Sequence, residues 1–159
     1  MTNVTSSPPA LGGTGIAGTG TGNMGPKRWT SEINIATYAA TVTTGGYIVV
    51  MNIPADTYFT LEQVEVVTAL SLDASASRVD IGDSADDDEF VSNASTLTAG
   101  TNLTLIKVNG SSGNVYTAAD TIRLKLTGDK LAGGTANATG VLRFVGTLMD
   151  TSRKAAATT

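Results

Sequence analysis

Residues 121–127 have the sequence TIRLKLT, in which polar and apolar side chains alternate without a break. A period of two is the pattern of a β-strand that buries one face and exposes the other. We therefore expect Ile122, Leu124 and Leu126 to point into a core, and the two basic side chains between them to face outward. A turn is expected directly after this strand, because residues 128–130 have the turn-favouring sequence GDK.

The same period recurs elsewhere in the chain, with turn residues between the repeats. Further strands are expected at residues 32–36, 47–53, 61–72, 78–81, 103–106 and 141–149. In residues 61–72, the side chains expected to share a buried face are Val64, Val66, Leu70 and Leu72. In residues 141–149, they are Leu142, Phe144 and Leu148.

The strand pattern predicts an all-β fold. No window of eleven or more residues carries a convincing helical stripe, and threonine, whose branched side chain suits strands, is frequent. Roughly eight short strands joined by Gly-rich turns are typical of a β-sandwich or jelly roll. Such a fold has exposed edge strands, which are available for pairing with a strand or arm of a neighbour.

The two ends of the chain differ from this body. Residues 1–31 form a Gly/Thr/Ser/Pro-rich arm with few apolar side chains, so the arm cannot order itself by burial. Residues 32–150 are predicted to form the sandwich domain, and residues 151–159 a basic, Ala/Thr-rich tail. An arm that orders only on binding indicates a protein that is bound into an assembly.

Composition excludes several kinds of catalytic and metal site. The chain contains neither histidine nor cysteine, which removes Ser-His-Asp and Cys-His catalysis and the usual zinc ligands. Residues 13–18 match the dinucleotide pattern G-x-G-x-x-G, but they lie in the low-complexity arm and not between a strand and a helix. We expect no catalytic residues and no cofactor. The sequence also shows no secretory signal pattern and no apolar run long enough to cross a bilayer.

Charge is distributed unevenly. Residues 32–150 hold all 14 acidic and six of the 10 basic residues, a net charge of −8. Such a body is not expected to bind nucleic acid, which needs clustered basic side chains. The remaining basic residues are Lys27, Arg28, Arg153 and Lys154 at the two ends. They are candidate contacts to acidic neighbours, or else ordinary solubilising charge.

Trp29, the single tryptophan, stands beside two of these basic residues. An aromatic side chain with basic neighbours is typical of an interface anchor. The alternative is that Trp29 covers one end of the sandwich core, since burial is equally typical of tryptophan. The sequence leaves both interpretations open.

Six acidic residues fall between Asp80 and Glu89. Carboxylates close together in a loop could bind calcium, which takes six to eight oxygen ligands. The weak candidates are Asp80, Asp83, Asp86 and Asp88. Their spacing does not match the calcium loop of a helix-loop-helix site, so the alternative is a solvated acidic turn between two strands.

Parts of the body resemble small structural proteins of tailed bacteriophages. The resemblance rests on residues 79–83 with the acidic turn that leads to Phe90, on residues 116–122, and on the final apolar strand at residues 141–150. It covers about residues 46–150 and leaves out the arm. It implies a virion protein with a β-sandwich body that decorates or cements the capsid shell, and it implies no catalytic residues.

The leading hypothesis is therefore a non-enzymatic capsid decoration or cement protein, which binds the phage head through its arm and a sandwich edge. Its expected partners are the major capsid protein and neighbouring copies of itself, as a homo-oligomer. It would be synthesised in the host cytoplasm and act on the outer capsid surface. The alternatives are a tail-fibre, neck or receptor-binding module, or a surface carbohydrate-binding domain, although aromatic residues are few (5%).

Overall fold

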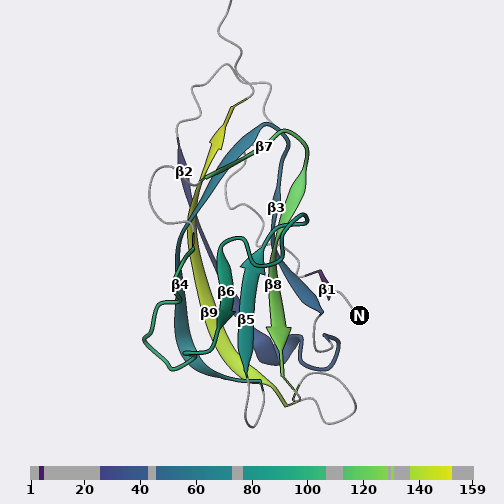
Figure 1. The fold of residues 1–159 in the computed structure, drawn as a ribbon, viewed down its shortest axis with the longest axis vertical. Helices are drawn as coiled ribbons and strands as arrows, with labels where there is room; N and C mark the ends of the chain where they lie inside the picture. The colour runs from purple at the N-terminus through teal and green to yellow at the C-terminus, as the bar shows by residue number, and fades with distance from the viewer. Residues whose placement is uncertain are drawn as a thin grey trace, which may run out of the picture.

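The computed structural model describes residues 4–5, 26–42, 46–72, 77–106, 113–128, 130 and 137–151 (Figure 1). Within these residues the fold is almost entirely β, with one short 3-10 helix, η1 (Ile35–Thr37). The strands are β1 (Val4–Thr5), β2 (Lys27–Asn34), β3 (Tyr47–Ile53), β4 (Thr57–Ser71), β5 (Arg78–Gly82), β6 (Val91–Ala94), β7 (Asn114–Tyr116), β8 (Asp120–Thr127) and β9 (Thr139–Asp150). No helix among the described residues is long and apolar enough to cross a membrane.

The strands form two sheets that enclose a shared core, which confirms the predicted sandwich. One sheet has the order β1-β3-β8-β5-β6, and the other has the order β2-β9-β4-β7. Every pair is antiparallel except β1 and β3, which run parallel. Figure 1 shows β2, β9 and β4 in one layer and β3, β8 and β5 in the other.

Strand β8 behaves as its alternating sequence predicts. Ile122, Leu124 and Leu126 are completely buried, whereas Arg123 and Lys125 are partly exposed. Burial of one such apolar side chain contributes roughly 1.5–3 kcal/mol. Because β8 lies between β3 and β5, its three apolar side chains help to hold the middle of their sheet against the opposite sheet.

Strand β4 begins four residues before the predicted start and changes phase along its length. Leu61 and Val64 are both buried although they are three residues apart. A strict period of two would place them on opposite faces. The register against β9 shifts between Leu61 and Gln63, so a bulge absorbs one residue and returns Val64 to the core. The predicted buried face, from Val64 to Leu72, is confirmed.

The strand predicted at residues 103–106 is wrong, although the predicted burial of its leucines is right. Leu103 and Leu105 are buried, but the segment makes only an isolated bridge, between Glu65 and Asn102. Its backbone bonds to β4 are spaced irregularly: Leu103 N donates to Val64 O, and Val66 N donates to Thr101 O. The segment therefore continues along the same edge of β4 as β7, at Val64–Val66 beyond the stretch that β7 pairs with, without forming a regular ladder.

The sheet includes residues that the sequence assigned to the arm. Strand β2 begins at Lys27 and pairs with β9 over its whole length, from Lys27 opposite Leu148 to Asn34 opposite Val141. Its even-numbered residues are exposed, while Trp29, Ser31 and Ile33 are buried. The ladder and this buried face fix residues 27–31 in the body. The dinucleotide-like residues 13–18, most of the arm, and residues 152–159 of the tail lie outside the described residues.

Candidate functional site

The acidic stretch forms a tight hairpin between β5 and β6. Asp83 N donates to Asp86 O (2.9 Å), and Phe90 N donates to Ile81 O (2.8 Å). A Cβ atom at Gly82 would lie 1.8 Å from Asp86 O, so only glycine lets the backbone fold back this closely. The tight backbone turn at Gly82 therefore holds the acidic residues of the hairpin near one another, although their like charges repel.

Asp83 is the buried carboxylate of this hairpin, with a relative exposure of 5%. Its Oδ1 accepts hydrogen bonds from Ala85 N (2.8 Å) and Asp86 N (3.1 Å), and its Oδ2 accepts one from the Tyr116 hydroxyl (3.0 Å). Burial by itself raises the pKa of the Asp83 carboxyl, but the hydrogen bonds that it accepts outweigh this effect and hold its pKa below the ordinary value. Asp83 therefore stabilises the turn as an ionised acceptor.

Tyr116 and Asn114 connect the hairpin to the edge strand β7. The Tyr116 hydroxyl donates its hydrogen bond to Asp83. Burial, together with the nearby carboxylates, raises the pKa of the Tyr116 phenol far above its usual range. Asn114 Nδ2 donates to Glu89 Oε2 (2.5 Å) and lies 3.4 Å from Asp83 Oδ2. These polar groups bond across the two sheets, which ties one end of the sandwich together.

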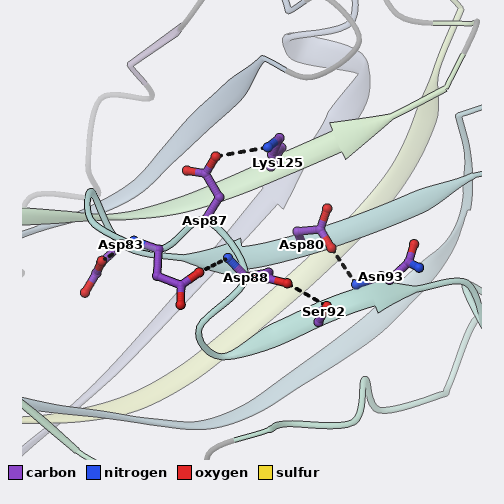
Figure 2. A network of polar contacts seen from close by, with 8 residues as sticks. Asp80, Asp83, Asp87, Asp88, Ser92, Asn93 and Lys125 are labelled. Carbon is purple, nitrogen blue, oxygen red and sulfur yellow. Dashed lines mark hydrogen bonds and ion pairs between the residues drawn. The ribbon is translucent and has the colours of Figure 1, made fainter.

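The other acids of the hairpin bind separate partners (Figure 2). Asp87 pairs with Lys125 on β8 at 3.0 Å, and hydrogen bonding to Asp87 raises the pKa of Lys125. Asp88 Oδ2 accepts from the Ser92 hydroxyl (2.7 Å), which together with Asp86 lowers the pKa of Asp88. Asp80 Oδ1 accepts from Asn93 N on β6.

The four candidate metal ligands do not converge on one point. Asp80 contacts β6, Asp83 points into the protein, Asp86 accepts from Asp88 N (3.3 Å), and Asp88 faces Ser92. Among the described residues, no group of three or more acidic side chains is placed to hold a metal ion. The arrangement fits the second interpretation from sequence, an acidic turn whose carboxylates satisfy backbone and side-chain donors.

The basic candidates at the start of β2 are on the surface. Lys27 and Arg28 are exposed, and Arg28 Nε lies 4.0 Å from Glu62 Oε2 on β4. A pair this exposed contributes little to stability. Lys27 and Arg28 are therefore accessible to a partner. Arg153 and Lys154 lie outside the described residues.

Trp29 is a core residue in this structure. Its relative exposure is 6%, and its ring packs edge-on against Phe59, with centroids 6.4 Å apart and planes at 71°. Phe59 packs in turn against Phe90 at the end of the acidic hairpin, with centroids 5.9 Å apart. The structure thus supports the second interpretation of Trp29, in which it completes the core. A partner would meet its neighbours Lys27 and Arg28 and not the indole ring.

An open depression of about 410 Å³ lies beside β4, lined by Glu62, Gln63, Asn102, Leu103 and Leu105. Gln63 Nε2 donates to Asn102 Oδ1 (2.8 Å), and Glu62 accepts from the Thr147 hydroxyl. Glu62 is the one ionisable residue in this lining. The depression therefore offers no nucleophile–base or acid–base pair of the kind that hydrolytic catalysis needs.

The edges of the sandwich differ in how they are covered. On one side, residues 97–106 cross from the β6 sheet to β4 and bond to it, with Leu70 N donating to Leu97 O (2.9 Å). On the opposite side, β2 pairs with β9 alone among the described residues, and β3 has beyond it only the two residues of β1. The β2/β3 side is therefore the more open one. The sandwich predicted from the alternating sequence implies edge strands, but the alternation does not identify which strands lie at the edges.

Comparison with known proteins adds a fold relationship. The chain is similar to a chain of the cyanophage Pam1 capsid asymmetric unit. The two share 18% sequence identity with a TM-score of 0.50, and the match covers 89% of this chain and 99% of that chain. A likeness at this identity shows a shared fold. No protein-family model and no curated protein matches the sequence.

Proposed function

We propose that this protein is a non-enzymatic structural component of a phage virion, and more specifically a capsid decoration or cement protein. The observation that carries the proposal is the fold shared with a chain of a cyanophage capsid asymmetric unit, which extends over nearly the full length of both chains. The resemblance of residues 79–83, 116–122 and 141–150 to structural proteins of tailed phages points the same way.

The geometry of the body supports this role. The described polar clusters serve to close turns and tie strands together, as the bonds of Asp83 and Asp88 show, and the depression beside β4 has no catalytic pair. One side of the sandwich keeps open strand edges, and exposed Lys27 and Arg28 lie at the start of β2 on that side. Strand edges and arms that order on binding are means of adding contacts without chemistry.

The proposed partners are the major capsid protein and neighbouring copies of this protein on the outer surface of the head, after synthesis in the host cytoplasm. An individual contact of an arm or edge is weak. On a shell, several such contacts act together, and their combined strength exceeds that of any one of them.

Cosedimentation with phage heads stripped of accessory proteins tests this proposal. We expect the full-length chain to bind at a fixed copy number per capsomer and to let the heads survive harsher heating. A chain without residues 1–26, which keeps all of β2, is expected to stay folded and lose binding. A matched full-length variant, Lys27→Ala/Arg28→Ala, distinguishes binding through the arm from binding through these two exposed charges.

Two results would contradict the proposal. If the full-length protein does not bind heads and is instead recovered on tails or host cells, the fibre, neck or receptor-binding alternative replaces it. If the chain without residues 1–26 binds heads with unchanged stoichiometry, the arm has no part in attachment.

A further inference from the structure

Strand β3 has the apolar composition of a strand that is covered on both faces, and it lacks the charged residues and proline that usually protect a sheet edge. Five of its seven residues are buried hydrophobic side chains, namely Ile48, Val49, Val50, Met51 and Ile53. Strands buried on both faces have such continuous apolar runs, whereas edge strands usually carry charges or proline. The exposed polar residue within β3 is Asn52.

Val49 is buried although its side chain does not lie in the core between the two sheets. Val49 pairs with Arg123, which points outward, so the Val49 side chain lies on the outer face of its sheet. It is nevertheless only 5% exposed, and it is not part of the core cluster that contains Ile48 and Val50. Arg123 itself stacks over the Tyr47 ring at 4.5 Å.

The arm supplies the strand beyond β3. Val4 lies opposite Ile48 and Thr5 opposite Val49, in a parallel pair of two residues. The rest of β3, from Val50 to Ile53, has no described neighbour on that side. The open edge of an apolar strand is a site for strand addition, and the pair with β1 shows that this arm sequence fits it.

The chain between β1 and β2 is long enough for the arm to reach another molecule. It comprises residues 6–26, seven of which are glycine. Fully extended, a segment of this length spans roughly 70 Å, which exceeds the width of a domain of this size. The arm of one copy can therefore reach the β3 edge of a neighbour.

We propose that the β3 edge binds Val4–Thr5 of a second copy of this chain, in the same parallel register, so that exchanged arms tie neighbouring copies together. Exchange replaces each backbone bond by an identical one, so it changes the connectivity and not the contacts. It becomes favourable where copies are held close together, since the local concentration of the neighbouring arm is then high. The inference rests on the proposed function for the setting in which copies are crowded.

Cysteine trapping in the full-length chain tests this exchange directly, because the natural sequence contains no cysteine. The two single variants Thr5→Cys and Val49→Cys carry different affinity tags and are mixed at high concentration under mild oxidation. Adjacent strands lie about 4.8 Å apart, which is within the Cα separation that a disulfide bridges. A yield of disulfide between the two differently tagged chains above that of random encounters requires the arm of one copy to reach the β3 edge of the other.

The matched control replaces the acceptor by Thr30→Cys, an exposed position on β2 in the other sheet. We expect the Thr5→Cys/Val49→Cys heterodimer to exceed this control by about tenfold, because pairing raises the effective concentration of the two thiols. Equal yields of the two heterodimers would overturn the proposal. So would a double variant Thr5→Cys/Val49→Cys that closes only within single chains at every concentration.

Amide hydrogen exchange on the unmodified chain gives a second readout that needs no cysteine. The chain's own ladder with β1 is only two residues long, so it does not keep the edge fully occupied. Protection of the amides from Ile48 to Met51 is therefore expected to rise with protein concentration if arms of other copies also occupy the edge. Protection that does not depend on concentration would show that the arm stays on its own body. Neither measurement uses phage heads, so failure of the arm exchange is distinguishable from failure of head binding.

Discussion

At the scale of single residues, the side chains with the most distinctive chemistry serve the body of the protein. Asp83 is a carboxylate that accepts hydrogen bonds from two backbone amides and one tyrosine hydroxyl in the interior. Trp29 is packed against Phe59 and is 6% exposed. Both residues have a structural role that can be measured in the isolated protein.

The hydrogen bonds of Asp83 predict a specific dependence of stability on pH. Because the folded-state pKa of Asp83 lies below its ordinary value of 3.8, its contribution is complete above that pH and is lost as the pH falls towards the folded-state value. Denaturant unfolding at a series of acidic pH values should show the wild type losing stability over this range, and Asp83→Asn losing less. Equal slopes for the two proteins would contradict this role for Asp83.

A second prediction at this scale concerns Trp29. Trp29→Ala should lower the free energy of unfolding of the isolated chain by about 3–5 kcal/mol, as expected for truncation of a buried tryptophan. Denaturant unfolding without any partner measures this loss, and Thr30→Ala, at the exposed neighbouring position, is the control. A change of less than about 1 kcal/mol would favour a partner-anchoring role over a core role.

At the scale of elements, the turn between β5 and β6 depends on backbone space. Gly82→Ala would place a Cβ atom 1.8 Å from Asp86 O, so the hairpin must open. We expect a loss of roughly 1–3 kcal/mol, because the backbone must shift to relieve the clash. Thermal unfolding measures the loss, and Ser84→Ala, in the exposed part of the same hairpin, should have little effect. A Gly82→Ala variant as stable as the wild type would show that the hairpin has more room than the structure gives it.

Element boundaries were the least predictable feature at this scale. The bulge between Leu61 and Gln63 and the irregular contacts of residues 97–106 with β4 arise from pairing with distant strands. A pattern of hydrophobicity records which residues are buried, but not where an extra residue is absorbed. The alternation along β4 therefore predicted the buried face correctly and missed the first four residues of the strand.

At the scale of the whole molecule, the body should fold without the arm. Apart from the two-residue ladder of β1, all the described strands and the core lie within residues 27–151. Deleting residues 1–26 should therefore lower Tm by no more than about 2–4 °C, the shift that corresponds to roughly 1 kcal/mol in a chain of this size. The deletion also uncovers the β3 edge, so concentration-dependent self-association of the shortened body is expected to increase.

Calorimetry and analytical ultracentrifugation check these two expectations. As a control, the full-length variant Val4→Pro keeps the arm but removes one backbone donor from β1. A shortened chain that fails to fold would show that the arm is part of the folding unit.

Periodicity and composition are local properties, and they were sufficient to predict the fold class and the inward faces of β8 and β9 and to show that no cysteine or histidine side chain is available. The tertiary structure decided which strands are edges, that Trp29 belongs to the core, and that the acids between Asp80 and Glu89 bind separate partners. Each of these depends on contacts between residues far apart in the chain. Strand order and side-chain contacts of this kind leave no periodic trace in the sequence.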